Sequence, residues 1–279
     1  MRIGFIADFF SSHLLGGAEL NDSVLLKHLK SEFEVTAILS SEVDPGELKN
    51  LDFLIISNFC LLSEKSKRFI ENNCNYIIYE HDHKYVSTRD PSQFVEFKIP
   101  KKHIVNLDFY RNAKKIVCLG QKQVDIISNN LKINNLHSIS CSLWSEEKLQ
   151  FLKKLSKKSQ KTKKYAIVNS NNQIKNTQKS IEFCRAKGLD YELISSRNPY
   201  EFIEILSKFE NLVFFPSVLE SMCRLVVEAK MVNCKVITIP KMLGASYEPW
   251  FQLNGEPLVS KISENVDAAL KDFLQIIKQ

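Results

Sequence analysis

The sequence predicts an α/β protein with two parallel sheets and helices on both faces of each sheet. Short apolar runs alternate with helical patterns along the whole chain, and strands that alternate with helices join as parallel neighbours. A lysine-rich, apolar-poor segment, Ser156–Lys164, interrupts this alternation once and divides it into two series. The chain has 279 residues, 44% hydrophobic and 25% charged, which is ordinary for a globular protein large enough for two domains.

The first series begins at the N-terminus, and its apolar runs have the length of buried strands. The expected strands are Arg2–Ala7, Glu34–Leu39, Phe53–Ser57, Asn75–Tyr79, Lys115–Leu119 and Leu136–Ile139. The expected helices are Ala18–Lys30, Glu64–Asn72, Ile104–Asn112 and Gln121–Asn130. Together they predict a first lobe at residues 1–155.

The second series repeats this rhythm after the lysine-rich segment. Its expected strands are Tyr165–Asn169, Tyr191–Ile194, Leu212–Phe215 and Lys235–Thr238. Its expected helices are Thr177–Lys187, Pro199–Lys208 and Arg224–Met231. They predict a second lobe at residues 165–255, followed by a helical segment at 256–279 that can dock on either lobe. We therefore expect two Rossmann-like lobes with a cleft between them.

The formal charge of +6 is concentrated in one place. Seven lysines fall within twelve residues: Lys153, Lys154, Lys157, Lys158, Lys161, Lys163 and Lys164. Without them the formal charge would be −1, so a broad face for nucleic acid is not expected. The cluster is typical of a solvated helix end and linker. The alternative is a contact of Lys153–Lys164 with anionic lipid or with an anionic acceptor.

Other features of the composition predict a cytoplasmic location, to which the lipid alternative for the lysine cluster would add a peripheral contact at the inner membrane face. The seven cysteines are odd in number and irregularly spaced, and several lie within apolar runs, which argues against a disulfide framework. No apolar run approaches the ~18 residues that a membrane span needs. Asp8 comes too early for a signal peptide.

The segment from Leu212 to Ile239 carries the strongest functional signal. An apolar strand stops at Pro216, a polar loop carries Glu220, and a helix that begins near Cys223 carries Glu228. Ligands bind at the carboxyl ends of strands in such sheets, and a helix start favours phosphate. Glu228 can lean back toward this site and accept bonds from two ribose hydroxyls, while Glu220 meets a second sugar. The pattern indicates a nucleotide-sugar, unless the two glutamates are merely solvated surface residues.

This segment resembles the Glu–seven-residues–Glu motif of the retaining GT-B glycosyltransferases of family four. Five residues match the usual form of the motif: Pro216, Ser217, Glu220, Glu228 and Ala229. Ser221, Met222 and Cys223 replace Gly-Phe-Gly, and Arg224 stands where an apolar residue is common. In the family this backbone approaches the donor, and side chains at Ser221 and Cys223 restrict it.

Two segments of the first lobe also resemble this family. Gly16-Gly17-Ala18-Glu19 is similar to its Gly-Gly-Ala-Glu segment after the first strand, where a helix start favours phosphate. His81, followed by Asp82, is similar to its His-Asp pair near the donor sugar and acceptor, and it fits better than His83. A plain loop and loop histidines with local hydrogen bonds are the alternatives.

The segment Asn169–Asn176 is similar to the family's phosphate-binding loop. Lys175 and Asn176 match, but the family's arginine is absent, and Arg224 can compensate because it sits at the neighbouring helix start. A further loop, Gly244–Glu248, follows the last strand, where the family often has a glycine and a glutamate. An exposed lysine without a function is the alternative for Lys175.

The resemblance implies transfer of a hexose from a nucleotide-diphosphate sugar to a glycan, lipid-linked or other acceptor, with retention of configuration. The catalytic residues would be His81, Glu220 and Lys175. The donor-binding residues would be Gly16, Gly17, Lys175, Asn176, Glu220, Ser221, Met222, Cys223, Arg224 and Glu228. No metal and no cofactor besides the donor are expected, since the sequence has no Asp-x-Asp. Nor does it have a dinucleotide-binding glycine motif or a Walker loop.

Two alternatives share these features. A nucleotide-sugar epimerase of the same fold would convert a donor without any acceptor. A nucleotide-sugar-binding protein that has lost catalysis would bind a donor but neither transfer nor hydrolyse its sugar, which would be consistent with the missing arginine. The resemblance also implies that the terminal segment, 256–279, returns to the first lobe.

Overall fold

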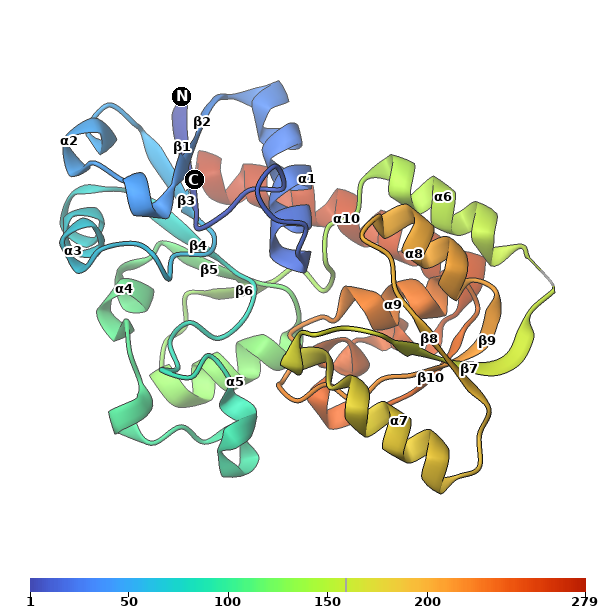
Figure 1. Ribbon diagram of the computed structural model, residues 1–279. Helices are drawn as coiled ribbons and strands as arrows, with labels where there is room; N and C mark the ends of the chain where they lie inside the picture. Colours follow the sequence, from blue (N-terminus) through green and yellow to red (C-terminus); the bar gives the residue numbers. More distant parts are fainter. Residues whose placement is uncertain (159) are drawn as a thin grey trace. The chain divides into compact units, whose positions relative to one another are not determined.

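The computed structural model describes residues 1–158 and 160–279, and the chain divides into two units (Figure 1). The first unit comprises Met1–Trp144 and Asn265–Gln279, and the second comprises Ser145–Glu264. The longest helix, α10 (Gly255–Lys278), therefore begins in the second unit and ends in the first. The functional lobes expected at 1–155, 165–255 and 256–279 differ somewhat from these units and stay a prediction.

The first unit contains a six-stranded, all-parallel sheet in the order β2-β1-β3-β4-β5-β6. The strands are β1 (Arg2–Ala7), β2 (Glu34–Leu39), β3 (Phe53–Ile56), β4 (Tyr76–Glu80), β5 (Lys115–Cys118) and β6 (Leu136–Ser138). The helices are α1 (Gly17–Glu32), α2 (Pro45–Leu48), α3 (Glu64–Asn73), α4 (Leu107–Asn112) and α5 (Gln121–Leu131). The strand order makes β1, β3 and β4 neighbours, so the loops at their carboxyl ends lie together.

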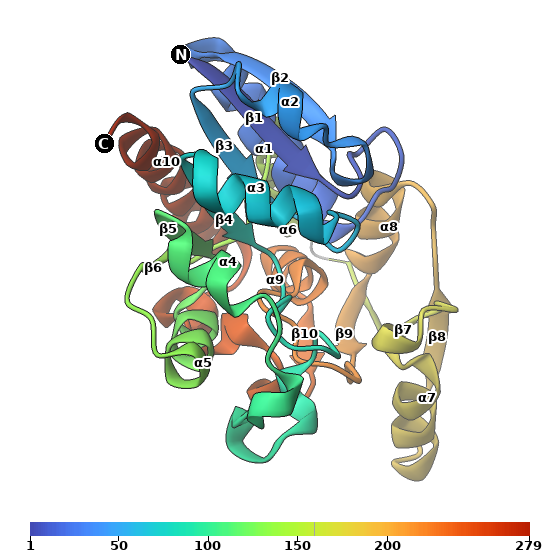
Figure 2. The ribbon, with the colours of Figure 1, turned by 90° about the vertical axis from the view of Figure 1, so that its left-hand side faces the viewer.

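Helices cover both faces of this first sheet. Figure 1 and Figure 2 show α3 and α4 on one face, and α1 with the last turns of α10 on the other. The central strands β3 and β4 are buried throughout, which explains why their sequences are almost continuously apolar. Phe273 of α10 packs against Tyr79 of β4 with ring centroids 5.0 Å apart, so the terminal segment completes the core of the first unit.

The second unit contains a four-stranded parallel sheet in the order β10-β9-β7-β8. The strands are β7 (Thr162–Val168), β8 (Tyr191–Ile194), β9 (Phe209–Val213) and β10 (Lys235–Ile237). The helices are α6 (Glu146–Ser156), α7 (Thr177–Ala186), α8 (Pro199–Leu206) and α9 (Arg224–Met231). Two parallel sheets flanked by helices confirm the predicted fold class.

Local sequence signals explain several helix starts. Ser145 caps α6 by accepting a hydrogen bond from the backbone N–H of Lys148, and Asn198 caps α8 in the same way before Pro199. Ser159, within the lysine-rich segment, lies outside the described residues. Of the helices in the described ranges, none is long and apolar enough to cross a membrane.

Candidate functional site

Three loops at the carboxyl ends of β7, β9 and β10 are hydrogen-bonded to one another. The backbone N–H of Ser217 donates to the carbonyl oxygen of Ile174 at 3.0 Å, which joins the loops after β9 and β7. The N–H of Glu220 donates to Met242 at 3.0 Å, and the N–H of Gly244 donates back to Glu220 at 2.8 Å. The middle loop, which carries the predicted motif, is therefore fixed on both sides by main-chain bonds.

Gly244 makes this close approach possible. A Cβ atom built at this position would collide with the carbonyl group of Ser221, and a backbone neighbour cannot swing away as a side chain can. We expect Gly244→Ala to lower the free energy of unfolding by about 1–3 kcal/mol, as overpacking does. Chemical denaturation measures this, with Gly46→Ala as the control, because a Cβ at Gly46 meets only the Asp44 side chain at 3.3 Å or more. Equal losses of stability in the two variants would contradict the conclusion that the close approach of the loops requires a glycine at position 244.

Lys175 and Glu220 form an ion pair across two of these loops. The Nζ atom of Lys175 lies 2.9 Å from Oε1 of Glu220, and both side chains are largely buried. Burial acts to lower the pKa of the Lys175 ammonium, but the Glu220 carboxylate outweighs it and raises that pKa. From the sequence, Lys175 was expected to bind the diphosphate and Glu220 the sugar. In the structure each is the other's partner, so a ligand there would bind a preformed pair.

The three residues that replace the family's Gly-Phe-Gly lie along the chain between Glu220 and α9, and all three are buried. Cys223, the N-cap residue of α9, has φ 57°, a left-handed conformation that favours glycine. A side chain therefore occupies a position whose backbone suits the family's second glycine. Ser221 and Met222 are buried, and Oγ of Ser221 has no hydrogen-bond partner among the described residues. Asn176, the cap of α7, is also left-handed, which asparagine tolerates.

Glu228 lies on α9 between two cationic side chains. Its Oε1 is 3.6 Å from a guanidinium nitrogen of Arg224, one helical turn earlier, and both side chains are nearly buried. Lys148 of α6 is buried as well, and its pKa is lowered by burial, although the Glu228 carboxylate partly offsets this. The Lys148 ammonium donates to Pro199 at 3.0 Å and lies 4.3 Å from the ring centroid of Tyr200. The site therefore contains a cation, Lys148, that the sequence analysis did not identify.

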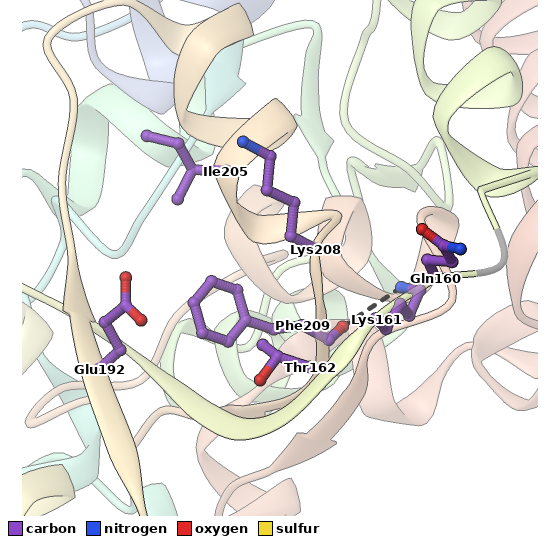
Figure 3. Close-up of a pocket in the computed structure, with 7 residues that line it drawn as sticks. All are labelled: Gln160, Lys161, Thr162, Glu192, Ile205, Lys208 and Phe209. Carbon is purple, nitrogen blue, oxygen red and sulfur yellow. Dashed lines mark hydrogen bonds between the residues drawn. The ribbon is translucent and has the colours of Figure 1, made fainter.

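A separate pocket of about 650 Å³ lies toward the amino ends of β7 and β9 (Figure 3). Its lining residues are Gln160, Lys161, Thr162, Glu192, Ile205, Lys208 and Phe209. The Lys161 ammonium donates to the carbonyl oxygen of Phe209 at 3.2 Å, the bond drawn in Figure 3, and to Val232 at 2.6 Å. Because ligands in such sheets bind at the carboxyl ends, this pocket is not the expected donor site.

Most of the lysine cluster has partners within the second unit. Lys153 and Lys157 both pair with Glu256, at 2.9 and 3.8 Å. Lys158 pairs with Glu204 at 3.3 Å, and Lys164 lies 3.9 Å from Asp190. These exposed pairs are weak and can rearrange. The contact with an anionic membrane stays a prediction, and it would compete with these glutamates and aspartates.

In the first unit, the loops after β3 and β4 bring His81 beside Ser57 and Asp22. The Nε2 atom of His81 lies 2.9 Å from Oδ1 of Asp22 and 2.9 Å from Oγ of Ser57. Ser57 also donates to the other carboxylate oxygen of Asp22 at 2.7 Å. The sequence analysis named His81 but missed both partners. The helical spacing of α1 indicates that Asp22 is buried, because it lies on the same face of the helix as the buried Leu25 and Leu29.

Gly16 and Glu19 shape the start of α1. A Cβ at Gly16 would collide with Oε2 of Glu19, because this carboxylate folds back and accepts from the Gly16 backbone N–H. Burial raises the pKa of Glu19, these backbone bonds lower it, and nearby Asp22 raises it further. An internal anion thus occupies the helix start where phosphate was expected. Donor binding at Gly16 and Gly17 stays a prediction that requires Glu19 to move.

A buried charge network surrounds the end of β4. Lys84 donates to Glu80 at 2.5 Å and to Asp82 at 3.0 Å, and Tyr110 also donates to Glu80. Burial raises the pKa of Glu80, whereas Lys84 and Arg89 hold the pKa of Asp82 well below its usual range despite burial. Asp82 is therefore paired with these two cations, and the carboxylate bonded to His81 is that of Asp22.

His83 differs from His81 in its surroundings. It is fully buried, neither ring nitrogen has a hydrogen-bond partner among the described residues, and burial lowers its pKa from 6.5 to about 4.

The lowered pKa of His83 makes stability depend on pH. His83 binds a proton near pH 6.5 in the unfolded chain, but only near pH 4 in the folded chain. We expect stability to fall as pH falls through this window, and the fall to be smaller in His83→Phe. Denaturant unfolding at pH 7, 5.5 and 4.5 measures it. His13→Phe, in an exposed loop, should keep the parent's dependence, and an unchanged dependence in His83→Phe would contradict the assignment.

Among the residues that the structure describes, no group of three or more histidine, cysteine, aspartate or glutamate side chains is placed to hold a metal ion. Each unit thus has a candidate site of its own. One is the set Lys148, Lys175, Glu220, Arg224 and Glu228 in the second unit. The other is the set Asp22, Ser57 and His81 in the first unit.

The sequence matches no protein-family model, and it matches no curated protein. Solved structures do resemble it over nearly the whole chain. A trehalose-6-phosphate synthase matches with a TM-score of 0.57 and 9% identity, covering 99% of this chain and 95% of the other. A glycosyltransferase from Rickettsia africae matches with 0.57 and 12%, covering 99% and 97%. The UDP-GlcNAc 2-epimerase of Methanocaldococcus jannaschii matches with 0.56 and 8%, covering 100% and 99%. The likeness is one of fold, and with its two Rossmann-like sheets this chain has the GT-B fold.

Proposed function

We propose that this protein is a glycosyltransferase that moves a hexose from a nucleotide-diphosphate sugar to an acceptor, with retention and without a metal. The observation that carries the proposal is the cluster at the start of α9. There Glu220 and Glu228, each held beside a cation, follow a strand at the carboxyl edge of the sheet. This edge is where the fold binds ligands, and its chemistry suits a diphosphate flanked by two sugars.

Each side chain has a proposed role in donor binding. Glu228 accepts bonds from the ribose hydroxyls, and Glu220 accepts from hydroxyls of the transferred sugar. Lys175, Arg224 and the N–H groups at the start of α9 neutralise the diphosphate. Lys148 adds a further cation beside Glu228 and can offset the absence of the family's arginine.

The proposed transfer needs no protein nucleophile. The leaving phosphate accepts the proton of the acceptor hydroxyl on the same face of the sugar, as the family resemblance implies. Catalysis then comes from positioning and from stabilising the charge that develops on the diphosphate. His81 is proposed to contact the acceptor, which is a glycan, a lipid-linked sugar or another hydroxyl compound.

The structural neighbours support this proposal without deciding between it and its alternatives. The trehalose-6-phosphate synthase structure concerns glycosyl transfer with retention, and an Anabaena protein of this fold, HepE, was solved with UDP at a TM-score of 0.55. The M. jannaschii epimerase was solved with UDP-GlcNAc and UDP, which favours an epimerase as the second candidate. A binding protein without catalysis is the third, motivated by the missing arginine.

A screen of UDP-, GDP-, ADP- and dTDP-sugars by thermal shift tests the shared premise, because a ligand that binds the folded state raises its apparent stability. Donors that bind are then incubated with and without candidate acceptors in excess chelator. Transfer to an acceptor with retained configuration supports the proposal. Conversion of the donor alone to an epimer supports the second candidate, and binding without any reaction supports the third. A requirement for manganese or magnesium would contradict the metal-independent mechanism.

A further inference from the structure

We infer that Asp22 and Ser57 are positioning residues that keep the proton of neutral His81 on Nε2, so that Nδ1 accepts a hydrogen bond from a substrate hydroxyl. Three neighbouring elements supply the three residues. Asp22 lies on α1, Ser57 follows β3 and His81 follows β4. All three side chains are at least nine-tenths buried, so water does not compete for their hydrogen bonds. The identity of the hydroxyl rests on the proposed function, whereas the tautomer does not.

The direction of each hydrogen bond follows from the chemistry of the groups. An ionised carboxylate only accepts, so both oxygens of Asp22 must accept hydrogen bonds from their neighbours. The Ser57 hydroxyl gives its single proton to Oδ2 of Asp22 at 2.7 Å. The bond of 2.9 Å between His81 and Oδ1 of Asp22 therefore requires a proton on Nε2. The Ser57 oxygen, also 2.9 Å away, can only accept from this same N–H. With the Ser57 hydroxyl donating to Asp22, the single N–H of a neutral His81 ring lies on Nε2.

The other ring nitrogen remains available. Nδ1 of His81 is buried and has no hydrogen-bond partner among the described residues. A buried polar atom without a partner is unfavourable, and this makes the site receptive to a ligand group that can pair with it. In the neutral Nε2–H tautomer Nδ1 carries a lone pair, so the matching group is a donor such as a hydroxyl. An ether oxygen or a fluorine at the same place cannot donate.

The surroundings of the ring restrict its motion. Tyr79 packs against His81 with ring centroids 4.2 Å apart and an interplanar angle of 57°. The carboxylate of Glu19, on the first turn of α1, also interacts electrostatically with His81 and Asp22. Neither contact provides a partner for Nδ1. The ring is therefore held by packing on one side and by the two hydrogen bonds at Nε2.

The test combines histidine nitrogen NMR with kinetics on the full chain. In the parent protein, labelled with ¹⁵N-histidine, the signals of His81 are expected to show the Nε2–H tautomer; comparison with His81→Gln identifies them among the six histidines. Asp22→Asn presents an amide that can donate to Nε2, so the proton should move to Nδ1. Turnover at saturating donor should then fall roughly tenfold or more, with little change in nucleoside diphosphate affinity.

Two further variants sharpen the result. Ser57→Ala keeps the bond between Asp22 and His81, so it should keep the tautomer and lose less turnover than Asp22→Asn. Asp108→Asn, at an exposed position on α4, is the matched control and should change neither measurement. An Nδ1–H tautomer in the parent overturns the inference. So does a tautomer switch in Asp22→Asn that leaves turnover unchanged. The tautomer is read without substrate, so failure of the inference is distinguishable from failure of the proposed activity.

Discussion

Replacing His81 by alanine is expected to lower turnover by roughly 10²-fold or more, within the range of a positioned polar or acid–base group. Nδ1 of His81 is buried and has no hydrogen-bond partner among the described residues, so removing the ring removes the proposed contact with the substrate hydroxyl. Donor affinity should change little, because the charged residues proposed to bind the donor, such as Glu220 and Glu228, belong to the second unit. Turnover is measured at saturating donor and divided by the folded fraction, so that lost stability is not counted as lost catalysis.

The natural comparison for this variant is His83→Ala. His83 is fully buried and carries no hydrogen bond, so its removal leaves a cavity and should lower stability more than turnover. A larger loss of turnover per folded molecule in His83→Ala than in His81→Ala would reverse the assignment. Near-normal turnover in His81→Ala would remove His81 from the proposed site.

Removing the Glu228 carboxylate is expected to weaken nucleoside diphosphate binding by about 2 kcal/mol or more, which is roughly 30-fold in Kd. The expected loss is that of hydrogen bonds from the ribose hydroxyls to a charged acceptor. The neighbours of Glu228 make the test sharper. Arg224 and Lys148 both interact with this carboxylate, so Glu228→Ala frees positive charge toward any phosphate. Isothermal titration calorimetry on the purified variants gives the affinities.

Pyrophosphate distinguishes the ribose contact from this change in charge. It lacks a ribose, so Glu228→Ala should bind it as well as the parent or better, while losing affinity for the nucleoside diphosphate. Glu228→Gln keeps the size of the side chain and should fall between the parent and alanine. Glu192→Ala, which alters an exposed glutamate in the pocket of Figure 3, is the control for donor binding. Unchanged nucleoside diphosphate affinity in a folded Glu228→Ala would disprove the ribose assignment.

The alternation of apolar runs was sufficient to predict both sheets, but it did not locate every strand end. The strand expected at Leu212–Phe215 is β9, which runs from Phe209 to Val213. Phe214 and Phe215 are buried beyond the end of the strand, and Phe214 still donates a backbone hydrogen bond to Ile237 of β10 at 3.0 Å, so the apolar pattern continues past the strand end. Similarly, the helix expected from Ile104 begins at Leu107, because Asn106 has a left-handed backbone that cannot continue a helix backward.

The sequence motif singled out Glu220 and Glu228, but it gave no indication of the residues that surround them. Lys148 interacts with Glu228 although 80 positions separate them, and no local spacing joins a residue of α6 to one of α9. Asp22, Ser57 and His81 meet only because β1, β3 and β4 are neighbours in the sheet. Strand order is a property of the whole fold, so such clusters are not visible in one sequence read locally. The pairing of Lys175 with Glu220 was hidden for the same reason.

The division of helix α10 between the two units has a consequence for the order of folding during synthesis. Residues 265–279 are made after the whole second unit, yet they supply Phe273 and other buried side chains to the core of the first. The sheet that carries His81 therefore leaves the ribosome with one face covered by α1 but not yet by α10, and it stays so while about 120 further residues are added. Domains that emerge first usually fold first, but here the earlier unit can finish only after the later one has been made. Until α10 docks, the apolar surface that it will cover is exposed, and such surface makes a nascent chain prone to aggregation.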